Sequence, residues 1–122
     1  MNYGRKITGG KYRKQSKKKF YEKHSQERIV ALGETKRKTF RVRGNNKKTI
    51  LLSSNTANVL SPENKKVQKA EIKNVIETPQ NRFLARQNRL LKGAIIETSL
   101  GKARITNRPT QEGQINAVLI KE

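Results

Sequence analysis

The most regular hydrophobic pattern in the chain is an alternation of polar and apolar residues over 39–43, Thr-Phe-Arg-Val-Arg. In an extended strand, alternation places Phe40 and Val42 on one face and the polar side chains on the other. The next residues, 44–47, are Gly-Asn-Asn-Lys, which is typical of a tight turn because Gly and Asn tolerate positive φ. A second strand follows over 49–53. The pattern predicts a β-hairpin whose apolar face, carrying Phe40 and Val42, contributes to the stability of the fold.

Further short elements follow the hairpin. On its second strand, Ile50 and Leu52 are expected to share a face. Residues 61–64, Ser-Pro-Glu-Asn, are typical of a turn. Residues 67–77 fit a helical period but also end in β-branched residues near a turn, and we favour a strand.

One short helix is expected over 79–88. Thr78 suits the N-cap position and Pro79 the first helical position. At 100° per residue, this helix gathers three arginines within about 60° of one another: Arg82, Arg86 and Arg89. Two interpretations remain open, a basic face on nucleic acid or an ordinary amphipathic surface helix.

The C-terminal third has the strongest strand pattern. Residues 93–98, 102–106 and 115–120 are expected to form three strands, separated by turns at 99–101 and 109–113. Short strands at this spacing favour closure of the sheet, which protects its edges. The predicted fold is mainly β: a small antiparallel β-barrel or meander with at most one short helix.

Residues 1–26 lack any hydrophobic period, and we expect them to form an extended basic arm, with 27–122 forming the barrel domain. The 122 residues fit one domain, but only 32% are hydrophobic and 5% aromatic. Burying so few apolar side chains cannot offset the conformational entropy that is lost when the whole chain becomes ordered. Part of the chain is therefore expected to order only on a partner.

The net charge of +20 identifies that partner as a polyanion. Residues 1–48 hold 17 basic and three acidic side chains, a net charge of +14, whereas the remaining 74 residues carry only +6. Nucleic acid is favoured over a membrane, because the arm has few bulky apolar residues to anchor it in lipid. No apolar run approaches the ~20 residues that span a bilayer, and no secretory signal is expected.

The residue types argue against an enzyme, a metal site or a cofactor site. The chain has no Cys and no Asp, and its Glu residues are scattered. Its one histidine, His24, lies in the arm, where we expect it to be exposed or to contact phosphate. Without a nucleophile–base set or a ligand cluster, we expect no catalysis, no cofactor and no small-molecule substrate.

Cations near glycines and aromatic residues have a direct use on RNA. Lysine is a point charge for phosphate, arginine adds a bidentate fork, and aromatic rings stack on unpaired bases. A Gly-Gly pair lets the backbone approach phosphate closely. The RNA-contacting residues expected in the arm and hairpin are Arg5, Lys6, Gly9, Gly10, Lys11, Tyr12, Arg13, Lys14, Lys17, Lys18, Lys19, Tyr21, Lys36, Arg37, Lys38, Arg41, Arg43, Asn45, Lys47 and Lys48. Those expected later in the chain are Arg82, Arg86, Arg89, Lys92, Arg104 and Arg108.

Seven stretches, in order, resemble the archaeal and eukaryotic small-subunit ribosomal protein family S8e. They are 6–11 (Lys-Ile-Thr-Gly-Gly-Lys), 17–22 (Lys-Lys-Lys-Phe-Tyr-Glu), 41–47 (Arg-Val-Arg-Gly-Asn-Asn-Lys), 57–59 (Ala-Asn-Val), 92–98, 100–109 and 113–120. Asn45 stands where the family usually has a second glycine, and the segment before the Thr-Gly-Gly motif is shorter here.

The resemblance implies a compact antiparallel barrel with an arm inserted among rRNA helices. It implies a structural role in the small ribosomal subunit of the cytoplasmic ribosome, with small-subunit rRNA and neighbouring ribosomal proteins as partners. One copy per ribosome, no homo-oligomer and no membrane partner are expected, and the short length is similar to that of archaeal members. The alternative from charge alone is a non-ribosomal protein that compacts DNA or RNA.

Overall fold

The computed structural model describes residues 4–12, 16–23 and 28–120. The residues named above that lie outside these ranges are Arg13, Lys14 and His24. In the described ranges the strands are β1 (Val30–Leu32), β2 (Lys36–Arg41), β3 (Lys47–Ser54), β4 (Thr56–Ser61), β5 (Lys66–Glu77), β6 (Arg89–Leu90), β7 (Ile95–Thr98), β8 (Gly101–Ile105) and β9 (Asn116–Leu119). The α-helices are α1 (Arg82–Arg86) and α2 (Pro109–Glu112), and single 3-10 turns are η1 (Phe20–Glu22) and η2 (Arg43–Asn45).

The centre of the fold is a closed barrel in the order β4-β5-β7-β8-β9. Neighbouring strands pair antiparallel, except that β4 and β9 pair in parallel where the barrel closes. Alternate side chains point inward, so β8 buries Ala103 and Ile105 while Arg104 between them is exposed. The prediction of a mainly β fold with a small barrel is confirmed, although one pairing in the barrel is parallel.

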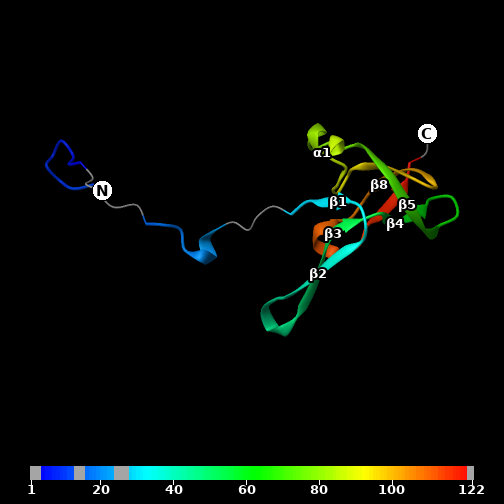
Figure 1. Cartoon of the computed structure of the whole chain (residues 1–122), viewed down its shortest axis with the longest axis horizontal. Helices are drawn as coiled ribbons and strands as arrows, with labels where there is room; N and C mark the ends of the chain where they lie inside the picture. The colour runs from blue at the N-terminus through cyan, green and yellow to red at the C-terminus, as the bar shows by residue number, and fades with distance from the viewer. Residues whose placement is uncertain (1–3, 13–15, 24–27, 121–122) are drawn as a thin grey trace.

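A second sheet, in the order β2-β3-β1-β6, lies beside the barrel (Figure 1). Its strand β1 pairs in parallel with β3 and antiparallel with β6. Val30, Leu51 and Leu90 from this sheet belong to the same buried cluster as Ile96 and Ile105 of the barrel. The two sheets therefore share one hydrophobic core.

The predicted hairpin is confirmed as β2 and β3, and it extends away from the barrel (Figure 1). Its residue Asn45 has a φ of 62°, so this asparagine adopts the left-handed conformation in the turn. The expected inward positions were partly wrong: Val42 is 40% exposed, and Phe40 is only half-buried. The reason is that this part of the hairpin extends away from the barrel, so the shared core does not reach Phe40 or Val42.

The prediction for the second hairpin strand was also wrong in one position. Ile50 is buried, but Leu52 is 42% exposed and Leu51 is fully buried in the shared core. Both faces of β3 are therefore covered at its middle, at Ile50 and Leu51, because Leu51 belongs to the core shared with the barrel and α2 also packs against β3. Simple alternation assumes that only one face of a strand is buried.

Residues 67–77 form a strand, as favoured from the sequence, and they make up most of β5. The helix predicted over 79–88 is shorter and starts later. Its N-cap is Asn81, whose side-chain oxygen accepts the Phe83 N–H at 2.9 Å, while Thr78 is fully buried and caps nothing. The helix ends before Asn88, which has a φ of 51°.

The turn predicted at 109–113 contains a second short helix, α2, so the described residues hold two α-helices rather than at most one. Pro109 stands at its start, and the N–H of Gly113 donates to the Pro109 carbonyl at 3.3 Å. Gly113 has a φ of 71°, and a Cβ there would lie 3.1 Å from the Thr49 carbonyl oxygen. This glycine allows α2 to approach β3 closely. Strands β1, β4 and β6 were not predicted.

Candidate nucleic-acid interface

The first described arm segment, residues 4–12, forms a small exposed loop. Its ends are joined by an antiparallel bridge between Arg5 and Lys11. The Gly9 N–H donates to the Lys6 carbonyl at 2.9 Å, the Lys6 N–H donates to the Gly10 carbonyl at 2.8 Å, and Gly9 has a φ of 79°. Arg5, Lys6 and Lys11 thus lie around one turn. Because Gly9 and Gly10 have no Cβ, the backbone of this turn stays accessible.

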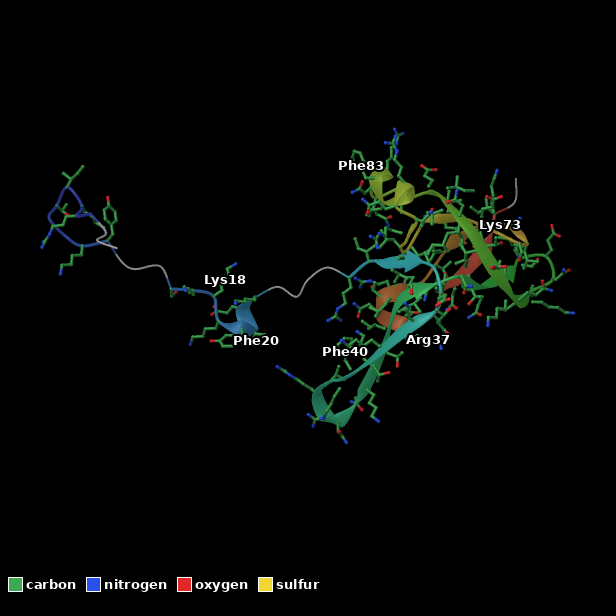
Figure 2. The ribbon with its side chains drawn as sticks, viewed as in Figure 1. Lys18, Phe20, Arg37, Phe40, Lys73 and Phe83 are labelled. Atoms are coloured by element: carbon green, nitrogen blue, oxygen red, sulfur yellow. The ribbon has the colours of Figure 1, made fainter. Side chains whose placement is uncertain are left out.

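The second described arm segment, residues 16–23, contains the η1 turn. The Glu22 carboxylate accepts the backbone N–H of Lys19 at 2.9 Å and so closes this turn on itself. Phe20 is 92% exposed and Tyr21 75% exposed, with the Lys19 ammonium 5.8 Å from the Tyr21 ring (Figure 2). An exposed ring next to several lysines is suited to stacking on an unpaired base while the lysines contact phosphate.

The hairpin gathers the second group of predicted residues. All eight of its candidates are exposed, and they are Lys36, Arg37, Lys38, Arg41, Arg43, Asn45, Lys47 and Lys48. Near the turn end of β2 the Phe40 ring lies 4.7 Å from the Arg28 guanidinium and 5.1 Å from the Lys38 ammonium. The π-face of the ring attracts each of these cations.

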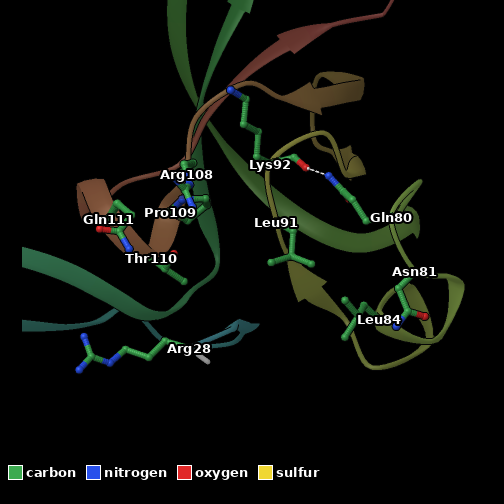
Figure 3. A pocket seen from close by; sticks show the side chains of 10 residues that line it. All are labelled: Arg28, Gln80, Asn81, Leu84, Leu91, Lys92, Arg108, Pro109, Thr110 and Gln111. Carbon is green, nitrogen blue, oxygen red and sulfur yellow. Dashed lines mark hydrogen bonds between the residues drawn. The ribbon is translucent and has the colours of Figure 1, made fainter. Parts of the chain in front are cut away.

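A groove of about 650 Å³ lies between α1 and α2, and we call it the α1–α2 groove (Figure 3). Its lining combines three cations with apolar and amide side chains: Arg28, Lys92, Arg108, Leu84, Leu91, Pro109, Gln80, Asn81, Thr110 and Gln111. The Gln80 amide fixes one wall by donating to the Lys92 carbonyl at 2.6 Å. Cations around an apolar floor are suited to a ribose or base with its phosphates at the rim.

A second groove, of about 530 Å³, lies on the other side of the hairpin base, and we call it the hairpin–barrel groove. Its lining is mostly polar and includes two cations: Arg37, Lys69, Thr35, Leu51, Ser54, Thr56, Asn58, Gln114 and Ile115. The two cations come from different sheets, Arg37 from β2 and Lys69 from β5.

The predicted basic face of α1 forms only in part. Arg82 and Arg86 are exposed and line a groove together with Glu77. Arg89, expected on the same helix, instead lies on β6, where it pairs with Ala31 of β1 and is half-buried. Its Nε is buried without a hydrogen-bond partner among the described residues.

The remaining candidates divide between grooves and barrel wall. Lys92 and Arg108 line the α1–α2 groove, whereas Arg104 lies on the outer surface of β8. Two groove cations, Arg28 and Lys69, were missed from the sequence. Arg28 stands alone before an apolar run at 29–32, and Lys69 stands at an ordinary outward position of a strand, so neither carried a local signal of nucleic-acid contact.

The described residues do not favour other kinds of site. They include no group of three or more His, Cys, Asp or Glu side chains placed to hold a metal ion. In the part of the chain that the structure describes, no helix has the length and apolarity needed to span a bilayer.

Comparison with known proteins gives a match over nearly the whole chain. Residues 1–120 match the family described as Ribosomal protein S8e. The small ribosomal subunit protein eS8 of Methanococcus aeolicus is 44% identical, over 97% of this chain and 93% of the relative. Proteins of the same name from Halorubrum lacusprofundi and Sulfolobus acidocaldarius are 46% and 43% identical, covering 95% and 99% of this chain and 93% and 95% of the relatives. The resemblance seen in the motifs therefore extends from the arm to the last strand.

Proposed function

Because the chain belongs to the ribosomal protein S8e family, we propose that it binds small-subunit rRNA through its basic arm and the basic hairpin and grooves beside it. The family membership makes the chain a structural constituent of the small ribosomal subunit, located in the cytoplasmic ribosome. The prediction that the chain is not an enzyme agrees with a family of structural ribosomal proteins.

The observation that carries the proposal is the concentration of exposed cations at one end of the chain. Residues 1–48 have a net charge of +14, and every described lysine and arginine among them is exposed. Such a surface gains free energy on RNA because each phosphate contact releases condensed counterions. The division into an arm, 1–26, and a barrel domain, 27–122, is part of the proposal: the arm supplies charge and rings, and the barrel supplies a rigid platform.

The contacts divide by chemistry. The arm lysines neutralise phosphates, while Phe20 and Tyr21 stack on unpaired bases. The hairpin arginines add planar, bidentate contacts to phosphate oxygens. The glycine turn at Gly9 and Gly10 brings backbone N–H groups close to a phosphate. We propose this role for all the candidate residues named from the sequence, including Arg13 and Lys14.

Small-subunit rRNA and neighbouring ribosomal proteins are the partners that the family membership implies. We propose a single copy per subunit without self-association, since a charge of +20 makes two copies repel each other. A DNA- or RNA-compacting role also accounts for the charge, but the match to S8e over residues 1–120 does not support it.

Limited proteolysis tests the proposal, because protease cleaves at arm lysines unless RNA covers them. We expect small-subunit rRNA to protect the arm, and heparin at equal charge to protect it much less. If about eight phosphates are neutralised, the logarithm of the binding constant falls with the logarithm of salt concentration at a slope of about −6 to −7. Equal protection by heparin and rRNA contradicts the proposal.

A further inference from the structure

The hairpin is a segment with one sign of charge. Residues 35–50 contain seven lysines and arginines and no acidic residue. Over 37–41 and 47–51 the two strands pair with each other, whereas β1 pairs with β3 only at Ser53 and Ser54. Among the described residues this part of the hairpin is therefore a two-stranded ribbon, with no third strand beside it and no acidic side chain of its own to offset its charge.

The strand register distributes the cations over both faces of the ribbon. Lys38 and Phe40 share one face with Lys48, which pairs with Phe40, and we call this the Phe40 face. On the opposite face, the Thr39 and Thr49 hydroxyls lie 3.2 Å apart. Flanking them on that face are Arg37, Arg41 and its pairing partner Lys47, and we call this the Arg41 face.

Each face continues into a different basic groove. On the Phe40 face, Arg28 stacks on Phe40 and Lys48 hydrogen-bonds to Gln111, and both Arg28 and Gln111 line the α1–α2 groove. On the Arg41 face, Arg37 lines the hairpin–barrel groove together with Lys69. The hairpin therefore separates two cationic surfaces, marked by Phe40 and Arg37 in Figure 2.

We propose that the hairpin is held between two separate segments of RNA, one on each face, so that the protein bridges them. This bridging proposal rests on the proposed function. It goes further by stating that two RNA segments are bound and that each contacts one face of the hairpin. One phosphate backbone on the Phe40 face alone leaves Arg37 and the directly opposed Arg41 and Lys47 unneutralised, and the like charges of that pair are destabilising. One on the Arg41 face alone leaves Lys38, Lys48 and Arg28 unneutralised. Insertion into one duplex is disfavoured, because the major groove of A-form RNA is too narrow for a ribbon with side chains on both faces.

Hydroxyl-radical footprinting of the full chain on small-subunit rRNA tests the proposal with two variants of equal charge. The Phe40-face variant carries Arg28→Gln, Lys38→Gln and Lys48→Gln. The Arg41-face variant carries Arg37→Gln, Arg41→Gln and Lys47→Gln. A control variant with Lys65→Gln, Lys66→Gln and Lys73→Gln removes the same charge from β5 and the turn before it, at exposed residues that line neither groove.

We expect each face variant to lose protection of a different set of nucleotides, in different RNA segments. The control is expected to keep both footprints. Each face variant loses about three phosphate contacts, so its salt slope falls in magnitude by about 2–3 and its affinity by roughly tenfold to a hundredfold. Circular dichroism of all three variants is expected to match the parent, since Gln removes charge from exposed positions without removing core.

A second assay measures bridging directly. The two protected segments are made as separate RNA fragments, one of them biotinylated, and the protein is expected to retain the second fragment on streptavidin. Either face variant is expected to reduce this retention about tenfold or more, and the control variant to leave it unchanged. Three results overturn the bridging proposal and leave the proposed function standing. They are loss of protection at the same nucleotides in both face variants, footprints that lie on the two strands of one helix, and unchanged retention of the second fragment by either face variant. Absence of any footprint for the parent protein instead overturns the proposed function.

Discussion

The barrel and the β2–β3 hairpin are both built largely from antiparallel strands, yet they differ in how much apolar surface they bury and how much charge they carry. In the barrel, Ile96, Ala103 and Ile105 are at most 1% exposed, and this burial from water supplies most of its stability. The hairpin buries almost nothing beyond Ile50 and Leu51 and carries seven cations. The barrel therefore holds its own shape, whereas the hairpin is anchored only where Ile50 and Leu51 are buried and carries positive charge with no acidic residue of its own.

The largest expected effect comes from the barrel. Ile96→Ala removes a fully buried side chain on β7 and is expected to lower the free energy of unfolding by about 2–5 kcal/mol. Urea denaturation measures this loss. The matched control is Ile76→Ala on β5, where the side chain is 46% exposed and a loss of less than about 1 kcal/mol is expected. Equal losses for the two variants contradict the assignment of the core.

The next effect concerns RNA binding and not stability. Reversing Lys17, Lys18 and Lys19 to Glu is expected to weaken binding to small-subunit rRNA roughly tenfold to a hundredfold, because three phosphate contacts become repulsive. Filter binding at several salt concentrations measures this change. The unfolding free energy is expected to stay within about 0.5 kcal/mol, since the three lysines are exposed. A large loss of stability with unchanged RNA binding contradicts the division of roles between arm and barrel.

A smaller effect is expected at Phe40 of the hairpin. Were Phe40 fully buried, its replacement by Ala would cost about 2–5 kcal/mol, but the ring is only half-buried, and the cations of Arg28 and Lys38 lie over it. Phe40→Ala is therefore expected to cost about 1–2 kcal/mol, measured by thermal unfolding. Val42→Ala, at a 40% exposed position of the same hairpin, is expected to change stability by less than about 0.5 kcal/mol. A larger loss for Val42 than for Phe40 contradicts this account of the Phe40 ring.

The smallest effect is local to the hairpin turn. Asn45→Ala places a residue that disfavours the left-handed region at a φ of 62°, at a cost of about 1 kcal/mol. The Val42 N–H donates to the Asn46 carbonyl at 2.8 Å across this turn, and its hydrogen exchange is expected to accelerate about fivefold. Exchange at barrel amides is expected to stay unchanged. Asn45→Gly is the control, since glycine accepts this φ, and slower exchange in the Ala variant than in the Gly variant contradicts the reasoning.

Much of the fold was predictable because the strand signal is local. The alternation over 39–43, the Gly-Asn-Asn-Lys turn and the three C-terminal strands all rest on neighbouring residues. The short strands β1 and β6 were missed because each is only two or three residues long and exists through pairing with a distant strand. The helix start was misplaced by three residues because Thr78 and Asn81 are both good caps, and burial of Thr78 decided between them.

The candidate site divides in the same way. The cations of the arm and hairpin were found from local charge density, but the two grooves were not, because their linings come from separate parts of the chain that meet only in the folded protein. Arg108 was a candidate without a location until the fold placed it in one groove with Leu84 and Leu91. Arg89 was assigned to a helix face, and its pairing with Ala31 placed it on β6.

The small β structure and its strongly cationic N-terminal part could be predicted without coordinates, because net charge and the two-residue period are read from residues close together in the chain. Only the tertiary structure decided that Leu51 and not Leu52 is buried, and that the hairpin has two open faces leading to two grooves. The physical reason is that alternation tells which side chains share a face, whereas burial depends on whether another layer, distant in the sequence, covers it.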